Sequence, residues 1–421
     1  MIGTDVEVVH APEAATRPGR PAWIRLVLLG VALFVALSAV RVITGSDQLT
    51  SSGTMGAALG LAVPIGMAAL GGLWSERSGV INIGLEGMLI LGTWFGAWGA
   101  YVTGNPWAGL VAGVVGGMLG ALLHALATVT FGVDHIVSGV ALTILATGLA
   151  RYLSVLTYLD VENAGASQSP PIKQGFPRWS LPGADSALGQ VEAERWFLVS
   201  DLAGLIRGLT TNVSAVTVIA VALVPISYWV LWRTAFGLRL RSCGENPVAA
   251  ASLGVGVRRL KYAAVIVSGG LAGLGGVFLS MVATSQYQEG QTNGRGYIGL
   301  AAMIFGNWRP GGLAAGAGMF GYTDAVQLRG SAVAVHALLL LAAVGLVALA
   351  AWQVSRRRYL PAAVSFAVGV AVYAWYATTD SLPGQIVTYT PHITTLLVLS
   401  LAAQRLRMPA ANGMRYRKGE E

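Results

Sequence analysis

The sequence predicts an all-α polytopic membrane protein with about 10–12 transmembrane helices. Of its 421 residues, 54% are hydrophobic and only 11% are charged, whereas a soluble domain has about 25% charged residues. Several apolar runs reach the roughly 20 residues that a helix needs to cross a bilayer. The net charge of +8 comes from Arg and Lys residues gathered between these runs. This pattern orients a membrane protein and differs from the aromatic-interleaved basic groove that binds nucleic acid.

Basic clusters between the apolar runs indicate the orientation of the chain. Arg17, Arg20 and Arg25 place the N-terminus in the cytoplasm. The first apolar run, 22–43, has no convincing cleavage site, so we interpret it as a retained helix. The expected spans are 22–43, 56–73, 81–101, 107–131, 136–157, 213–232, 262–284, 297–306, 311–328, 332–354, 360–378 and 390–404.

These spans divide the chain into consecutive units. The units are a disordered cytoplasmic N-terminus (1–21), a first transmembrane half (22–158), an extracytoplasmic segment (159–212), a transmembrane helix (213–232), a cytoplasmic loop (233–261), a second transmembrane repeat (262–355), additional C-terminal helices (356–404) and a cytoplasmic tail (405–421). Within the extracytoplasmic segment, 193–209 is expected to be an amphipathic surface helix. Pro64 is expected to interrupt the second span. The run 297–306 is short enough to be either re-entrant or the end of a helix that begins earlier.

The loop 233–261 is the longest basic interruption between the two hydrophobic halves. Inside it, Asn246 suits the N-cap of a short helix, Pro247 its first position and Gly254 its C-terminal end. Such a helix is too short to bury a core by itself. We therefore expect it to dock into another protein and to transmit force to the two halves around it.

Two pairs of segments suggest an internal repeat. Residues 83–89 (IGLEGML) resemble 298–304 (IGLAAMI), and 108–113 (AGLVAG) resemble 311–316 (GGLAAG). The alternating direction of the spans makes the two copies inverted in the membrane, as in transporters whose substrate path lies where the repeats meet. The alternative is chance similarity in a chain rich in Ala, Gly and Leu.

Glu86 is the sharpest candidate for a residue on a substrate path, together with Asn82 beside it. A carboxylate within a span costs roughly 2.5–3.5 kcal/mol on insertion scales, so it usually faces a polar pathway or a partner. Two interpretations stay open. Glu86 either lines such a pathway, or it lies near the cytoplasmic end and is satisfied by neighbouring amides or by Arg77.

Trp94 and Asn307 complete the candidate substrate path. Trp94 could stack on a planar substrate, although Trp near a helix end is more often an interface anchor. Other ionisable side chains fall within spans without the order of a proton relay. These residues are His124, Arg151, Asp324 and His336.

Several motifs of catalytic or metal-binding proteins are absent from the sequence. It contains no phosphate-binding G-x-x-x-x-G-K-[ST] loop, no His/Cys cluster with metal-ligand spacing and no G-x-S-x-G nucleophile motif. We therefore expect no metal and no cofactor, and we do not expect an enzyme. If transport is driven by ATP, the ATPase is a separate chain.

Four ordered segments carry a resemblance to a known family: 75–88 (SERSGVINIGLEGM), 236–255 (FGLRLRSCGENPVAAASLGV), 261–276 (KYAAVIVSGGLAGLGG) and 304–312 (IFGNWRPGG). They resemble the permease subunit of ABC importers of the simple-sugar, nucleoside and branched-chain amino-acid class. The chain is most similar to the nucleoside branch, which works with basic membrane protein-type lipoproteins. It departs from the family in its long outer segment and its additional C-terminal spans.

The resemblance implies the partners and the place of the protein. The permease would lie in the lipid bilayer of a bacterial cytoplasmic membrane, with both termini inside. Its implied partners are an ABC ATPase subunit, a second permease that is a related but different chain, and an extracytoplasmic substrate-binding lipoprotein. The segment that resembles the ATPase-contacting loop contains the expected coupling residues Arg241, Glu245, Asn246, Pro247, Ala250 and Gly254.

Other functions stay open at this point. One rival is a secondary transporter driven by an ion gradient through Glu86 and other buried ionisable groups. Another is an ABC permease for simple sugars, because an apolar path has no readable substrate code. A membrane enzyme or a purely structural subunit is a weaker alternative, since the sequence has no catalytic constellation.

Overall fold

Helices dominate the computed structural model, which describes residues 22–330, 332–390 and 406–416. The expected N-terminal segment 1–21 and nearly all of the expected span 390–404 lie outside the described residues. The helical elements are α1 (Ala22–Thr44), the 3-10 turn η1 (Asp47–Leu49), α2 (Ser52–Arg77), α3 (Leu85–Thr103), α4 (Pro106–Ala125), the π-helical turn η2 (Leu126–Thr130), α5 (His135–Tyr158), α6 (Ala184–Ala193), α7 (Val199–Thr210), α8 (Ala215–Arg233), α9 (Ala235–Glu245), α10 (Pro247–Ser252), α11 (Val257–Val277), the π-helical turn η3 (Phe278–Ala283), α12 (Arg295–Phe305), α13 (Pro310–Arg329), α14 (Ala332–Ser355), α15 (Tyr359–Thr378) and α16 (Gly384–Thr388). Two short strands, β1 (Arg178–Trp179) and β2 (Val213–Ser214), pair antiparallel.

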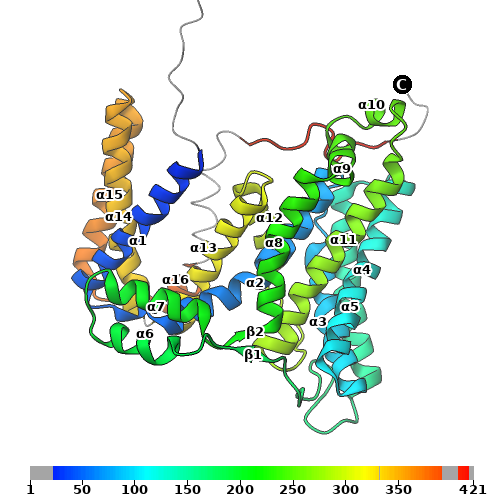
Figure 1. Ribbon diagram of the computed structural model, residues 1–421, viewed down its shortest axis with the longest axis horizontal. Coiled ribbons are helices and arrows are strands. Elements are labelled where there is room, and N and C mark those ends of the chain that lie inside the picture. Colours follow the sequence, from blue (N-terminus) through cyan, green and yellow to red (C-terminus); the bar gives the residue numbers. More distant parts are fainter. Residues whose placement is uncertain (1–21, 331, 391–405, 417–421) are drawn as a thin grey trace, which may run out of the picture.

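Helix α2 lies at the centre of the bundle, where it packs against α11, α12 and α13. Helices α3, α4 and α5 lie on one side of it, and α1, α14 and α15 lie on the other (Figure 1). Helices α9 and α10 lie at one end of the bundle and α6 and α7 at the opposite end. We call these the α10 end and the α7 end.

The outer helices present apolar side chains outward, as a lipid environment requires. In α4 and α5, Leu119 is 51% exposed and Ile144 is 69% exposed. In α15, Leu360 is 79% exposed. Together with the helical bundle, these surfaces confirm the predicted all-α polytopic membrane protein.

Equivalent helix pairs of the proposed repeats pack in the same way. Helix α13 crosses α2 at Gly321, where an added Cβ would meet the Ala58 carbonyl oxygen at 2.5 Å. Helix α4 crosses α11 at Gly117, where an added Cβ would meet the Gly269 carbonyl oxygen at 2.2 Å. Such close approach of backbones is typical of small residues in membrane helices. In the proposed repeats, α2 is equivalent to α11 and α4 is equivalent to α13. An inverted repeat therefore predicts both contacts, α2 with α13 and α11 with α4.

Helix α2 continues without a break through Pro64, so the expected interruption of the second span is wrong. A proline within a membrane helix is tolerated when neighbouring elements satisfy the freed backbone groups. Here Pro64 is buried, and its backbone lies against α11 at Gly275. Packing from α11 therefore supports the helix at the point where its own hydrogen-bond ladder is incomplete.

Seven helical segments of the described residues are long and apolar enough to cross a membrane: Asp47–Arg77, Pro106–Thr130, His135–Tyr158, Ala215–Arg233, Val257–Ala283, Ala332–Ser355 and Tyr359–Thr378. The expected spans 81–101 and 311–328 correspond to α3 and α13, which are rich in Gly and largely buried in the protein and so do not reach the same hydropathy. The expected span 297–306 is α12, which has 11 residues. At 1.5 Å per residue, α12 covers only about 16 Å and cannot cross a bilayer.

The segment 159–212, which was expected to be extracytoplasmic, contains two helices where one was expected. Residues 193–209 do not form one continuous helix, because Arg195 and Leu198 adopt the left-handed region with φ of 56° and 63°. Helix α6 ends before this break and α7 begins after it. The expected amphipathic surface helix is thus α7, which turns Leu202 and Ile206 outward and its small residues inward.

Candidate translocation path and coupling surface

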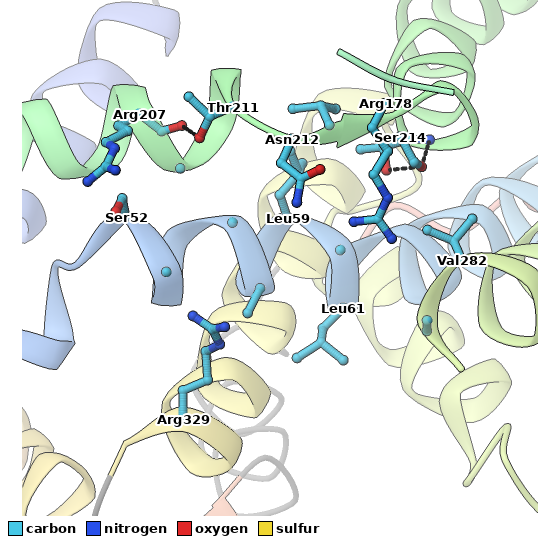
Figure 2. A pocket seen from close by; sticks show the side chains of 18 of the residues that line it. Ser52, Leu59, Leu61, Arg178, Arg207, Thr211, Asn212, Ser214, Val282 and Arg329 are labelled. Carbon is cyan, nitrogen blue, oxygen red and sulfur yellow. Dashed lines mark hydrogen bonds between the residues drawn. The ribbon is translucent and has the colours of Figure 1, made fainter. Parts of the chain in front are cut away.

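Two cavities follow helix α2 from the α7 end into the bundle. The first, which we call the polar cavity, has a volume of about 600 Å³. Figure 2 shows Arg178 entering it from β1 and Arg329 from the end of α13. The guanidinium group of Arg207 is bound by Asp185 and Glu192 at 2.8 and 3.0 Å. Among the described residues, no carboxylate pairs with Arg178 or Arg329, so the mouth of this cavity is cationic.

The second cavity, which we call the apolar cavity, has a volume of about 480 Å³. It is lined by small and apolar side chains of α2, α8 and α13. Leu59 of α2 lines both cavities, and α7 also borders both, through Gly208 in the polar cavity and Leu209 in the apolar one. A solute entering at the α7 end would therefore pass from a polar to an apolar environment along one helix.

The four path residues expected from the sequence do not line either of these two cavities. Asn82, Glu86, Trp94 and Asn307 instead bind other parts of the protein. Residues of the run 56–67 of α2, many of them Gly or Ala, contribute to the lining of both cavities, together with residues of α7, α8 and α13. A glycine- and alanine-rich run was the available signal, but the same composition also occurs where helices pack tightly.

Glu86 binds the N-terminus of α12 and not Arg77. Its carboxylate accepts hydrogen bonds from the backbone N–H groups of Gly294 at 2.9 Å and Gly296 at 2.6 Å. Glu86 is 5% exposed and lies in the first turn of α3. A carboxylate is favoured at both helix N-termini, because their unpaired N–H groups and dipoles are positive. Of the two open interpretations, the structure places Glu86 with backbone amides, which lie in the proposed second repeat.

We predict that Glu86→Ala destabilises the protein substantially. Each hydrogen bond to a charged group contributes about 1.5–3 kcal/mol, and the variant loses two such bonds and leaves the buried Gly296 N–H and the partly buried Gly294 N–H without an acceptor. Glu86→Gln keeps one acceptor oxygen, so its thermal unfolding midpoint should lie between those of Glu86→Ala and the wild type. Thermal unfolding in detergent measures the effect, with the exposed Glu162→Ala as control. An unchanged midpoint in Glu86→Ala would refute the capping role.

Asn82 and Trp94 are buried between helices. The Asn82 side chain donates to the Ser268 hydroxyl at 2.9 Å, and its own oxygen is buried without a partner. The Trp94 indole N–H donates to the Ser154 hydroxyl at 2.9 Å, which ties α3 to α5. Trp94 also stacks on Trp98 with ring centroids 6.0 Å apart. Both side chains therefore have packing roles in this conformation.

The remaining ionisable residues within spans have separate partners. The His124 ring lies 2.9 Å from the Ser138 hydroxyl and 3.0 Å from the Ile81 carbonyl oxygen. Arg151 pairs with Glu289 at 2.6 Å. Of the other two residues, Asp324 pairs with Arg295 at 3.7 Å and the His336 ring contacts the Thr379 hydroxyl at 3.0 Å. These contacts connect different helices and form no continuous chain of titratable groups.

At the α10 end, the predicted short helix is present with the predicted cap. The Asn246 side chain accepts a hydrogen bond from the Ala249 backbone N–H at 2.9 Å, and Pro247 begins α10. Gly254 follows the helix with φ of +81°, a left-handed conformation that favours glycine. The side chains of Val248 and Leu253 are 50% and 85% exposed. An apolar residue exposed on a capped turn is a candidate contact for a partner protein.

The other expected coupling residues hold this loop against the bundle. Pro247 and Ala250 are buried. Arg241 donates to the Leu231 carbonyl oxygen at 2.9 Å and stacks on the Trp232 ring. Glu245 lies 3.8 Å from the Arg77 guanidinium at the end of α2. The loop therefore divides into an inward side that anchors it and an outward side formed by α10.

Cys243 should react slowly with thiol reagents. Its side chain is fully buried, and burial raises the pKa of its thiol. A raised pKa leaves less thiolate at neutral pH, so the labelling rate should increase as the pH rises. We predict that maleimide labels Leu253→Cys at least about tenfold faster than the native Cys243. Mass spectrometry of the two sites measures the rates, and equal rates would contradict the described packing.

At the α7 end, a buried ion pair anchors α7 to the bundle. Asp201 of α7 is 1% exposed and pairs with Arg41 of α1 at 2.7 Å. It also accepts hydrogen bonds from the hydroxyl groups of Ser38 and Thr50. This arrangement fixes α7 against the end of α1 and the start of α2, where α7 borders both cavities.

The structure is a multi-pass helical bundle. Its cavities open toward one end, and an anchored, exposed helix lies at the other. This is the architecture of a membrane transport subunit. The chain belongs to the branched-chain amino acid transport system / permease component family, which matches residues 54–349. It is thus an ABC transporter permease subunit of the class that handles nucleosides and sugars.

Three relatives illustrate this class. The chain is 33% identical to the guanosine ABC transporter permease protein NupQ of Bacillus subtilis, over 65% of this chain and 82% of the relative. It is 30% identical to the nucleoside ABC transporter permease protein NupC of Lactococcus lactis, over 63% and 79%. It is 27% identical to the glucose ABC transporter permease protein TsgB13 of Haloferax volcanii, over 62% and 65%. No solved structure matches the chain.

Proposed function

We propose that this chain is the nucleoside-transporting permease of an ATP-driven importer in a bacterial cytoplasmic membrane, with both termini in the cytoplasm. A separate ABC ATPase would bind at the α10 end, where ATP hydrolysis takes place on the partner. A substrate-binding lipoprotein would deliver the solute at the α7 end. A second, related permease would complete the path.

The observation that supports this proposal most strongly is that helix α2 connects the α10 loop with both cavities. The outward side of α10 exposes Leu253, while the inward side of the loop is fixed to the end of α2 through Glu245 and Arg77. The same helix α2 lines both cavities. A push on α10 would therefore act on a helix that borders the path.

The environment of Glu86 favours this function over an ion-coupled transporter. Both of its carboxylate oxygens accept hydrogen bonds from backbone amides of α12. Glu86 is also 5% exposed, so a proton or a cation would have to reach a buried carboxylate and compete with these amides for its oxygens. Releasing these bonds in every cycle would leave the partly buried Gly294 N–H and the buried Gly296 N–H without an acceptor, at a cost of about 1–3 kcal/mol for the buried group.

Uptake by the reconstituted transporter tests the proposal. The permease, its ATPase, its second permease and its binding lipoprotein are placed in liposomes, and entry of labelled guanosine is measured with and without ATP. We expect ATP-dependent entry, with a glucose competitor having no effect. Glucose uptake would identify the sugar alternative suggested by the Haloferax relative. Uptake by the permease alone under an ion gradient would refute the proposal.

A further inference from the structure

The segment 406–416 lies across the α10 end with a turn at 410–413, and we call it the C-terminal strap. It is bonded to the protein through its own backbone. The N–H of Ala411 donates to the Gly244 carbonyl oxygen at 2.8 Å, and the N–H of Gly413 donates to the Gly79 carbonyl oxygen at 3.2 Å. Gly244 lies in the last turn of α9, and Gly79 follows α2. The strap therefore bridges the coupling loop and the first repeat.

The strap also contacts the second repeat. The N–H of Arg407 donates to the Asn307 side-chain oxygen at 2.7 Å, in the corner between α12 and α13. The N–H of Ala410 donates to the Glu245 carboxylate at 3.2 Å. Four backbone N–H groups within seven residues thus bind other elements. A segment with its donors satisfied in this way is part of the folded structure and not a fraying end.

A buried carboxylate joins the strap to both repeats at one point. Glu76 of α2 is 5% exposed and accepts a hydrogen bond from the Asn412 side chain at 2.8 Å. The same oxygen accepts the Trp308 indole N–H at 2.7 Å. Glu76 belongs to the first repeat and Trp308 to the second. Movement of either repeat at this end must therefore move or break the contact with the strap.

Apolar packing covers the coupling loop from the same side. The Ala411 side chain is 5% exposed. Tyr416 packs against the small cluster of Cys243, Ala250 and Val257, which joins one buried residue each of α9, α10 and α11. Cys243 is fully buried within this cluster. Its accessibility therefore reports whether the strap is in place.

We propose that the C-terminal strap is a coupling element, which ties the α9–α10 loop to the cytoplasmic ends of both repeats so that a displacement of α10 reaches them together. The coupling role rests on the proposed ATP-driven function. The strap lies beyond residues 54–349, over which the family matches. Its residues are positioning residues, since they act through Glu76, Gly244 and Asn307 and contact no solute.

Two neighbouring alanines provide the test. Within the strap, the side chain of Ala411 is buried against the bundle, whereas the side chain of Ala410 is exposed. Ala411→Arg should displace the strap, while Ala410→Arg keeps every backbone bond and serves as the matched control. Asn412→Leu, which removes only the bond to Glu76, replaces Ala411→Arg if that variant is not inserted. Each full-length permease is assembled with its partner subunits, and three properties are measured: the Cys243 labelling rate, ATPase co-isolation and ATP-dependent uptake.

We expect Ala411→Arg to label at Cys243 at least about fivefold faster than the wild type and to lose at least about fivefold in uptake, with the ATPase still co-isolating. Ala410→Arg should match the wild type in all three properties. Unchanged labelling in Ala411→Arg would overturn the placement of the strap. Faster labelling with normal uptake would overturn its coupling role. ATP-independent uptake by the wild type would refute the proposed function itself, and with it the coupling role.

Discussion

Gly117→Val is expected to prevent the permease from assembling its helical bundle. A Cβ at Gly117 would lie 2.2 Å from the Gly269 carbonyl oxygen and 2.8 Å from the Gly273 Cα. Both contacts are backbone atoms of α11, so no side-chain rotation can relieve them, and α4 and α11 must separate. Overpacking typically costs about 1–3 kcal/mol, and a forced separation of two backbones should cost at least the upper value.

Gly148→Val is the matched control for this prediction. Gly148 lies in α5, where nothing lies within 4 Å of an added Cβ. The substitution changes the same atoms in a membrane helix without a neighbour to displace. Gel filtration after detergent extraction measures the fraction of monodisperse protein. We expect Gly117→Val to fall below a tenth of the wild-type yield, estimated from the upper value above, while Gly148→Val stays near it. Similar yields for the two variants would show that the α4–α11 crossing tolerates separation.

Leu253→Arg is expected to abolish ATP-driven uptake without affecting the fold of the permease. Leu253 is 85% exposed and contacts no core cluster, so a longer polar side chain costs little in the isolated protein. If α10 docks into an ATPase, this side chain becomes buried at the interface. Truncating or charging a central interface residue commonly costs 2 kcal/mol or more, which is roughly 30-fold in affinity.

Leu181→Arg controls for the general effect of a new surface charge. Leu181 is 57% exposed, and its backbone N–H donates to the carbonyl oxygen of Thr210, the last residue of α7, at the end opposite α10. We expect the ATPase to co-isolate with the Leu181→Arg permease and not with the Leu253→Arg permease. Thermal unfolding should be unchanged in both. Normal uptake by Leu253→Arg would exclude the outward side of α10 as the docking contact.

The coupling helix could be predicted because its determinants are local. Asn246, Pro247 and Gly254 specify a cap, a first helical position and a left-handed stop within nine residues, and each acts on the backbone of this short segment. The structure confirms this local geometry. The partner that covers α10 could not be identified in the same way, because an exposed side chain does not indicate what binds it.

Glu86 shows where pattern reasoning ends. A carboxylate in a membrane helix predicts a polar partner, and the partner is the N-terminus of α12, more than 200 residues away in the sequence. Every residue except proline has a backbone N–H group, so the sequence does not show which of these groups will bind a distant side chain. The same reason hides the strap, since four of its bonds use backbone donors.

The sequence by itself determined the membrane class, the apolar runs, the capped helix and the family. These properties depend on composition, hydropathy and neighbouring residues, which are read along the chain. Only the tertiary structure decided that α12 stops short of crossing, that small side chains of α2 line the cavities and that residues 406–416 bind both repeats. These features depend on which distant parts of the backbone meet and how closely they approach. A glycine in the sequence is compatible both with a tight helix crossing and with the lining of a cavity, so its presence does not distinguish the two.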